Sequence, residues 1–241
     1  MNLNLKKKFY RLYESSILLN FNLLIHKLFK EKDPGSLNFD FSNEPTRQFI
    51  VQDIINSKNY KSYLEIGCMD DKLFSKVDCQ KKVGVDPFSG GTLRMTSDQF
   101  FLTNNDKFDC IFIDGLHKYH QVRKDINNSL KFLNENGVIL LHDCLPDSIF
   151  VQAIPRCKKN WNGDVWKSIV EFRTNSEVDV YTCFADQGIG VILKKNNQNL
   201  LKLKTKDFLN LKFKEYYENY KFLMNVVSYK ELTEILELKK N

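Results

Sequence analysis

Residues 107–117, with the sequence KFDCIFIDGLH, constrain the fold of this chain most. The run from Cys110 to Ile113 is apolar and rich in β-branched and aromatic residues, and Asp114 and Gly115 close it. A short apolar run of this kind is typical of a strand buried on both faces, as in a parallel sheet. Because ligands bind beyond the carboxyl ends of parallel strands, Asp114 and His117 stand where chemistry takes place.

A second segment repeats this arrangement at residues 137–143, GVILLHD, where an apolar run leads into His142 and Asp143. Carboxyl ends of parallel strands meet at one edge of a sheet. The sequence therefore predicts that two carboxylates, Asp114 and Asp143, and two imidazoles, His117 and His142, come together at that edge.

Strands and helices are expected to alternate along the middle of the chain. Apolar patterning predicts helices over 46–56, 71–77, 97–102 and 119–133, one more capped by Asp164, and strands over 63–67, 82–87, 93–95, 108–113, 137–141, 178–181 and 190–193. On the first of these helices, Phe49, Ile50 and Ile54 are expected to face inward. The last two strands are separated by a short Gly-containing connection and predict a hairpin. We expect an α/β fold with a doubly wound, seven-stranded, mostly parallel sheet and a C-terminal antiparallel hairpin.

Both ends of the chain differ from this middle part. Residues 1–32 place apolar side chains at helical spacing, and the Asp33-Pro34-Gly35 sequence stops the helix. We expect a helical arm over 1–45, an α/β domain over 46–195 with a lid at 146–165, and a helical extension over 196–241. The arm is interpreted as packing on the domain or on a second subunit, or as a basic amphipathic membrane contact.

Composition limits the partners of the chain. The net charge of +6 comes from scattered lysines without a compact Arg cluster, which indicates a solvated surface and argues against nucleic acid. Six cysteines show no CxxC or metal-ligand spacing, which is typical of a reduced, cytoplasmic protein. No apolar run has transmembrane length, and Asn20 and Asn22 interrupt the one segment that resembles a signal peptide.

Four short segments carry a resemblance to a known family: LEIG at 64–67, GVDP at 84–87, FIDGLH at 112–117 and LHD at 141–143. Over about residues 60–195 the chain resembles class I S-adenosylmethionine-dependent methyltransferases with a Rossmann-like fold. The two strand endings resemble the macrocin and mycinamicin type of sugar O-methyltransferase. This resemblance implies a transferase that methylates a sugar hydroxyl, on a nucleotide-linked sugar for surface polysaccharide biosynthesis, in a homo-oligomer.

The resemblance also implies roles for individual residues. His117 is expected to be the catalytic base, with Asp114 beside it, and Asp114, His142 and Asp143 to hold Mg²⁺ or another divalent metal. Asp86 is expected to accept hydrogen bonds from the ribose of the cofactor. The full set expected to contact S-adenosylmethionine is Glu65, Gly67, Cys68, Asp86, Pro87, Thr96, Ser97, Asp98 and Asp114.

Two departures from the family pattern keep alternatives open. Asp71 stands where the cofactor loop usually has its last glycine, and His142 stands where metal-dependent members usually carry an acid. Mg²⁺ prefers oxygen ligands, so either the metal differs, His142 does not ligate, or no metal binds. The rival functions are methyl transfer to a catechol or an amine, and a non-catalytic membrane or complex scaffold. Structural roles, such as capping or holding a loop, are the alternatives for Asp114, His117 and Asp143.

A nicotinamide dehydrogenase is disfavoured, because Gly67 has no glycine partner before Gly84 and the G-x-G-x-x-G pattern is missing. The large aromatic residues of the C-terminal half, Trp161, Trp166, Phe172 and Tyr181, are expected to lie in the core rather than at a substrate site.

Overall fold

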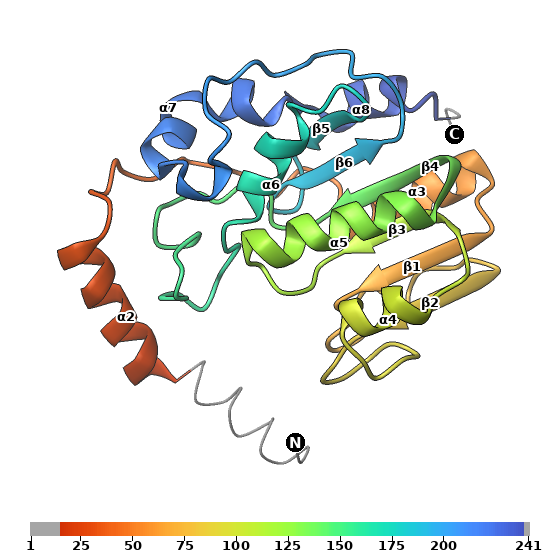
Figure 1. Cartoon of the computed structure of the whole chain (residues 1–241), viewed down its shortest axis with the longest axis horizontal. Coiled ribbons are helices and arrows are strands. Elements are labelled where there is room, and N and C mark those ends of the chain that lie inside the picture. Colours follow the sequence, from red (N-terminus) through yellow and green to blue (C-terminus); the bar gives the residue numbers. More distant parts are fainter. Residues whose placement is uncertain (1–14, 239–241) are drawn as a thin grey trace.

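A seven-stranded sheet organises the chain, as a computed structural model describing residues 15–238 shows (Figure 1). The first 14 positions of the helix predicted over 1–32 lie outside the described residues. The strands are β1 (Ser62–Ile66), β2 (Lys81–Val85), β3 (Phe108–Ile113), β4 (Leu133–Leu141), β5 (Asp179–Cys183), β6 (Ile189–Leu193) and β7 (Val226–Val227).

The order of the strands in space is β2-β1-β3-β4-β6-β5-β7. The strands β1 to β4 pair in parallel, and β6 runs antiparallel to both of its neighbours, β4 and β5. The predicted fold class is therefore confirmed: a mostly parallel, Rossmann-like sheet closed by an antiparallel pair. Two antiparallel pairings in succession leave β5 parallel to β4, so the carboxyl ends of β1, β3, β4 and β5 share one edge.

Helices cover both faces of this sheet (Figure 1). The helices of the described residues are α2 (Ser16–Phe29), α3 (Arg47–Lys58), α4 (Ser97–Thr103), α5 (Tyr119–Phe132), α6 (Val165–Phe172), η1 (Phe208–Asn210), α7 (Phe213–Met224) and α8 (Tyr229–Ile235), of which α2 lies outside the layers around the sheet. Hydroxyl side chains fix several helix starts: Thr46 caps α3, and capping boxes led by Thr96 and Ser228 begin α4 and α8.

Alternation along the strands divides the core into two clusters. Leu64, Ile111 and Ile139 point into the cluster that α4, α5, α6 and α7 cover. Their chain neighbours Tyr63, Cys110 and other residues point to the opposite face, where α3 and α8 pack. Successive residues of a strand face opposite sides of the sheet. A strand that is apolar at every position is therefore buried on both faces, as the sequence of these strands predicts.

Three details of the secondary-structure prediction are wrong. Residues 72–76 form turns instead of the helix predicted over 71–77, and Asp71 before them has a left-handed φ of 60°. Residues 93–95 make only a single bridge, from Leu93 to Val85. The seventh strand is instead β7, which pairs in parallel with β5 from the C-terminal part of the chain.

Two side chains also differ from their predicted placement. Phe49 on α3 was expected to face inward but is 54% exposed, and it lies edge-on against Tyr229 of α8. Asp164 makes no side-chain bond to α6; its Oδ1 accepts from the backbone N–H of Tyr119 at 2.6 Å. Asp164 therefore stabilises the start of α5, because the loop before α6 folds back over that helix end.

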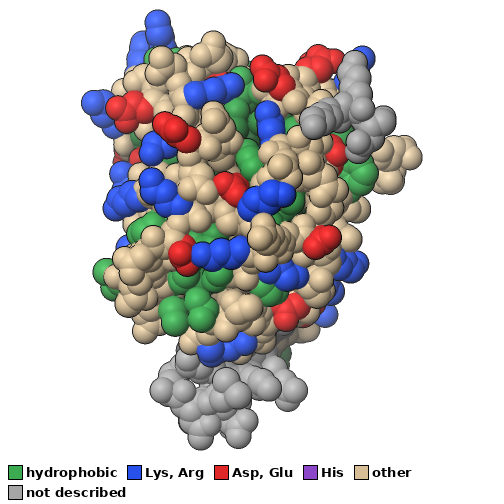
Figure 2. Space-filling view, turned by 90° about the vertical axis from the view of Figure 1, so that its right-hand side faces the viewer, with side chains coloured by type: hydrophobic (Ala, Val, Ile, Leu, Met, Phe, Trp, Pro, Cys, Tyr) green, Lys and Arg blue, Asp and Glu red, His purple; other side chains and the backbone are tan. Residues whose placement is uncertain are grey.

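The surface carries both signs of charge. On the face shown in Figure 2, Lys and Arg side chains are interspersed with Asp and Glu side chains. This distribution agrees with a solvated surface on that face. Within residues 15–238, no helix combines the length and the apolarity needed to cross a membrane.

Asp125 on α5 provides a pH-dependent prediction. Its carboxyl is buried beside Gln121, and burial raises its pKa to about 6. An acid whose pKa is higher in the folded state destabilises the fold once it ionises, so stability falls as pH rises from about 4 to 6. We expect Asp125→Asn to raise the free energy of unfolding at pH 7 by about 1–3 kcal/mol. Urea unfolding at pH 7 and pH 4 checks this, and an equal gain at both values would contradict the burial effect.

Candidate active site

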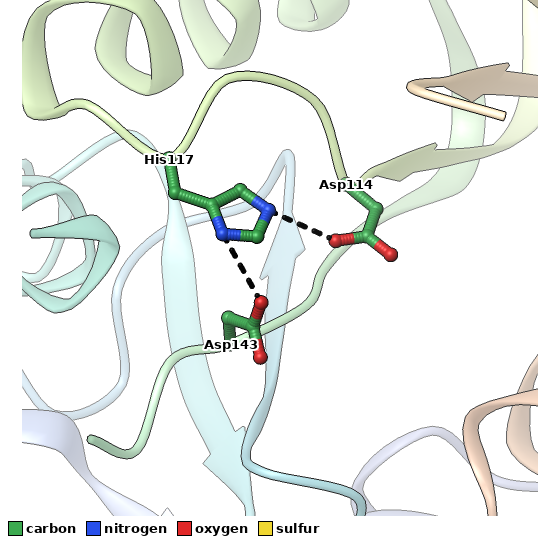
Figure 3. Close-up of side chains that lie close together, drawn as sticks. All are labelled: Asp114, His117 and Asp143. Atoms are coloured by element: carbon green, nitrogen blue, oxygen red, sulfur yellow. Dashed lines mark hydrogen bonds and ion pairs between the residues drawn. The ribbon is translucent and has the colours of Figure 1, made fainter. Parts of the chain in front are cut away.

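Four side chains from two strand ends meet at the carboxyl edge of the sheet. Asp114 follows β3, His142 and Asp143 follow β4, and His117 lies in the loop before α5. The imidazole of His117 bridges the two carboxylates: Nε2 lies 3.2 Å from Asp114 Oδ1, and Nδ1 lies 3.2 Å from Asp143 Oδ2 (Figure 3). The structure thus brings together the four residues that the sequence placed at this edge.

His142 faces the same carboxylates from the other side. Its Nδ1 lies 3.4 Å from Asp114 Oδ1 and 3.3 Å from Asp143 Oδ1. Its Nε2 lies 2.8 Å from Nη1 of Arg47 and 3.1 Å from Asp186 Oδ1. Burial would lower the pKa of His142, but the charges of Asp114 and Asp143 outweigh burial and raise that pKa well above its usual range, which favours the charged ring.

Arg47 and Asp186 form a second layer behind His142. The backbone N–H of Arg47 donates to Asp186 Oδ2 at 2.6 Å, and the two charged side chains lie 3.6 Å apart. A cavity of about 220 Å³ opens beside them, lined also by Lys72 and Lys76. Arg47 begins α3 and Asp186 follows β5, so two further elements hold the orientation of His142.

The irregular segment before α6 covers His117. The indole of Trp161 stacks on the imidazole with ring centroids 5.4 Å apart, and its carbonyl oxygen lies 3.0 Å from Nδ1. Asn162 donates to Asp143 Oδ1 at 3.1 Å. Trp166, Phe172 and Tyr181 are buried in the core as expected, whereas Trp161 belongs to the site.

Gly163 allows this segment to pass close to His117. Its φ is +60°, and a Cβ there would lie 1.8 Å from the carbonyl oxygen of His117. Only a residue without a side chain permits that approach. Asp143 also has a left-handed backbone, with φ of 61°, a conformation that costs about 1–3 kcal/mol and concentrates at functional sites.

The charged side chains of this cluster shift one another's pKa values. Burial alone would raise the pKa of Asp114, but the imidazoles of His142 and His117 outweigh it and hold that pKa well below its usual range. Burial would lower the pKa of His117, but the charge of Asp143 and the contact with Asp114 raise it to about 9. His117 is therefore protonated at pH 7, and its proton neutralises part of the charge of two carboxylates.

The same atoms fit a cation. Asp114, His117 and Asp143 each offer a ligand atom, and these atoms lie within 4.8 Å of one another. His142 is not part of this group, since its ring is directed at Arg47 and Asp186 as well. Two carboxylates suit a hard divalent cation, whereas a ligating imidazole suits a transition metal.

The loop after β1 packs tightly against the loop after β3. Gly67 has φ of 91°, and a Cβ there would lie 2.2 Å from the carbonyl oxygen of Asp114. Asp71 takes a left-handed backbone of the kind that glycine favours, and its Oδ1 accepts from Gly91 N at 2.6 Å. The aspartate that departs from the family pattern therefore ties the β1 loop to the β2 loop.

Asp86 lies buried at the end of β2, where a ribose acceptor is expected. Its Oδ1 accepts from the backbone N–H groups of Phe88 and Ser89, and its Oδ2 accepts from Met69 N at 2.9 Å. A carboxylate offers about four acceptor positions, so one position on Oδ2 remains. The three backbone contacts therefore leave one acceptor position on Asp86.

The other residues that are expected to contact the cofactor lie in and around these loops. Most of them make contacts with other residues of the protein. Glu65 is buried, its pKa is raised to about 7 by burial, and it accepts from Tyr63 at 2.6 Å. Cys68 is buried against Gly84. Pro87 follows Asp86 and is partly buried. Thr96 caps α4, and the side chains of Ser97 and Asp98 both accept from Gln121.

Sequence reasoning missed Arg47, Asp186, Trp161 and Asn162. A signal existed for Asp186, because it follows β5 and the carboxyl-end argument applies to that strand too. Arg47 reaches the site from a helix before the sheet, and Trp161 and Asn162 reach it from an irregular segment. For these three, no periodicity or spacing marks the contact.

Asp86→Ala gives a prediction at the cofactor side. The change removes an acceptor from three backbone N–H groups, so we expect a loss of about 1–3 kcal/mol in unfolding free energy as well as weaker nucleoside binding. Thermal unfolding and calorimetry with S-adenosylhomocysteine measure the two effects. Full stability combined with unchanged affinity would contradict both assignments.

Comparison with known protein families gives a match for part of the chain. Residues 76–144 match a family model described as a methyltransferase domain. The match covers less than a third of the chain but includes Asp86, Asp114, His117, His142 and Asp143. No curated protein matches the chain.

Solved structures with a similar backbone arrangement include an O-methyltransferase from Bacillus cereus in complex with SAH, 12% identical, covering 72% of this chain and 97% of that chain, with a TM-score of 0.45. A putative O-methyltransferase from Klebsiella pneumoniae is 14% identical, covering 72% and 95%, with a TM-score of 0.46. The methyltransferase MycE from the mycinamycin biosynthetic pathway, with Mg, SAH and mycinamycin VI, is 13% identical, covering 66% and 50%, with a TM-score of 0.42.

Proposed function

We propose that this protein is an S-adenosylmethionine-dependent O-methyltransferase. One observation carries the proposal: Asp114, His117, His142 and Asp143 converge at the carboxyl edge of the sheet, next to the loop of Gly67. The methyltransferase-domain match spans these four residues. A sulfonium methyl group is reactive already, so the protein has to align an acceptor hydroxyl and remove its proton, which such a cluster suits.

The cofactor is S-adenosylmethionine, held between the loops after β1 and β2. Asp86 accepts one ribose hydroxyl with its remaining acceptor position, and Gly67 allows the loop to pass close to Asp114. The expected contacts of Glu65, Cys68, Pro87, Thr96, Ser97 and Asp98 with the cofactor belong to this proposal. Occupation of a second position on Asp86 requires the Met69 N–H to leave Oδ2.

His117 is the base of the proposed reaction, and it has to lose its own proton first. With a pKa of about 9 it holds a proton at pH 7, and removing it there costs about 3 kcal/mol. A divalent cation on the oxygens of Asp114 and Asp143, with Mg²⁺ as the first candidate, would supply positive charge that offsets this cost and orients the acceptor. His142, fixed by Arg47 and Asp186, positions Asp114 and Asp143.

The acceptor in this proposal is a hydroxyl of a nucleotide-linked sugar used for surface polysaccharide. The cavity beside Arg47 supports an anionic acceptor, since three cationic residues and one acid line it: Arg47, Lys72, Lys76 and Asp186. The rival acceptors are a catechol or an amine. Transfer of a labelled methyl group from S-adenosylmethionine to panels of nucleotide sugars, catechols and amines tests the assignment; methylation of amines alone would contradict it.

Metal removal gives a separate prediction. We expect chelation to lower turnover by about 10²–10⁴-fold, because His117 then stays protonated and no charge orients the acceptor. The measurement is turnover in chelator, followed by re-addition of Mg²⁺ or Mn²⁺. Full turnover in chelator would leave Asp114 and Asp143 as groups that bind the acceptor directly.

A further inference from the structure

Helix α2 presents its apolar side chains outward. Ile17, Phe21, Leu24 and Leu28 are 85%, 58%, 54% and 63% exposed. At 100° per residue these positions fall within about 60° of the helix circumference, so they form one continuous stripe. Phe29, 76% exposed at the end of the helix, lies about 80° away from this stripe.

The opposite side of α2 is the one that packs on the protein, and it is partly polar. Leu19, Asn22 and His26 are buried there. Asn22 donates to the carbonyl oxygen of Arg156 at 2.8 Å, and His26 Nε2 lies 3.2 Å from that of Pro155. The helix is therefore fixed by polar contacts to the segment that covers the candidate site, while each side chain of its apolar stripe is more than half exposed. Figure 1 shows α2 at the edge of the molecule, outside the layers around the sheet.

The net charge of the N-terminal segment indicates which kind of partner this stripe contacts. Residues 1–32 contain seven Lys and Arg residues and two acids, a net charge of +5 out of +6 for the whole chain. Among the described residues, Lys27, Lys30 and Lys32 are exposed beside or beyond the stripe. A second copy of the chain would bring like charges together at such a face. An anionic lipid surface offers both the opposite charge and an apolar layer.

We propose that α2 docks the protein on anionic lipid bilayers through the stripe Ile17, Phe21, Leu24 and Leu28. Fourteen residues are too few to span a bilayer, and no described helix is long and apolar enough to do so, so the helix lies in the interface plane. Through Asn22 and His26 the bound helix holds the covering segment of the candidate site. The inference is independent of the methyltransferase function.

Co-sedimentation of the full chain with vesicles tests this proposal. Wild-type protein is expected to bind phosphatidylglycerol-containing vesicles at least about tenfold more tightly than phosphatidylcholine vesicles, and to lose that preference in high salt. The double variant Phe21→Glu/Leu24→Glu is expected to lose about tenfold or more in binding to the anionic vesicles. Leu102→Glu is the matched control, because Leu102 is 84% exposed on α4, away from the stripe, and it should bind like wild type.

Circular dichroism and thermal unfolding verify that the variants fold. Wild-type protein that stays in the supernatant with both kinds of vesicle would overturn the proposal, as would a double variant that binds as well as Leu102→Glu. Analytical ultracentrifugation addresses the competing occupant. A dimer that the double variant dissociates, without binding of the wild type to vesicles, would assign the stripe to a second copy instead.

Discussion

Asp114→Asn is expected to lower turnover by about 10²–10⁴-fold, the range for losing a positioned acid–base group. Asp114 Oδ1 lies 3.2 Å from the half-buried His117 and 3.4 Å from the buried His142, so the change removes a negative charge beside both imidazoles. The pKa of His117 should fall from about 9 toward its ordinary value, because Asp114 helps to raise it. Asparagine keeps the shape of the side chain, so the fold should persist.

Three measurements separate this effect from simple destabilisation. Turnover reports the chemistry, NMR titration of the imidazoles reports the pKa of His117, and urea unfolding reports stability. Asp106→Asn is the matched control, since Asp106 makes an exposed ion pair with Lys81 and precedes β3, at the edge of the sheet opposite the cluster. A turnover for Asp114→Asn within about threefold of the control would contradict a catalytic role for this carboxylate.

Gly163→Ala is expected to disrupt the site from the covering segment. An added Cβ would lie 1.8 Å from the carbonyl oxygen of His117, and alanine disfavours the φ of +60°. The loss in unfolding free energy should be about 2–5 kcal/mol, from overpacking together with backbone strain. Trp161 and Asn162 precede Gly163 directly, so their contacts with His117 and Asp143 should be lost with it.

Gly115→Ala is the matched control for this change. Gly115 lies in the same group of loops, but a Cβ there would meet its nearest neighbour, Ile66, at an ordinary 3.5 Å. Thermal unfolding of both variants measures the difference, and 1 kcal/mol corresponds to about 2–4 °C in a chain of this size. If Gly163→Ala melts with Gly115→Ala and keeps its turnover, the covering segment does not hold His117 in the way described.

The candidate cluster was predictable from sequence because it follows from strand ends. Asp114 and Asp143 each close an apolar run, and parallel strands bring their carboxyl ends together without any knowledge of loops. The same logic predicted the α/β sheet and its antiparallel pair. This reasoning did not predict the edge strand β7, because a strand of only two residues gives no periodic signal.

The remaining parts of the site depend on contacts that the sequence does not mark. Arg47 reaches His142 across 95 positions, and Trp161 reaches His117 across 44 positions through an irregular segment. Asp71 looked like a break in the cofactor loop, yet it takes a left-handed backbone and binds Gly91. A polar residue in a glycine-like conformation is recognisable only once the backbone is known.

Calorimetric titration with S-adenosylhomocysteine, with and without Mg²⁺, tests the central proposal most directly. We expect micromolar affinity from the loops of Gly67 and Asp86, and a further gain in stability or affinity with metal from Asp114 and Asp143. The Asp86→Ala variant should weaken the affinity. Absence of binding by the folded wild-type protein, with and without metal, would contradict the methyltransferase assignment and favour a non-catalytic scaffold.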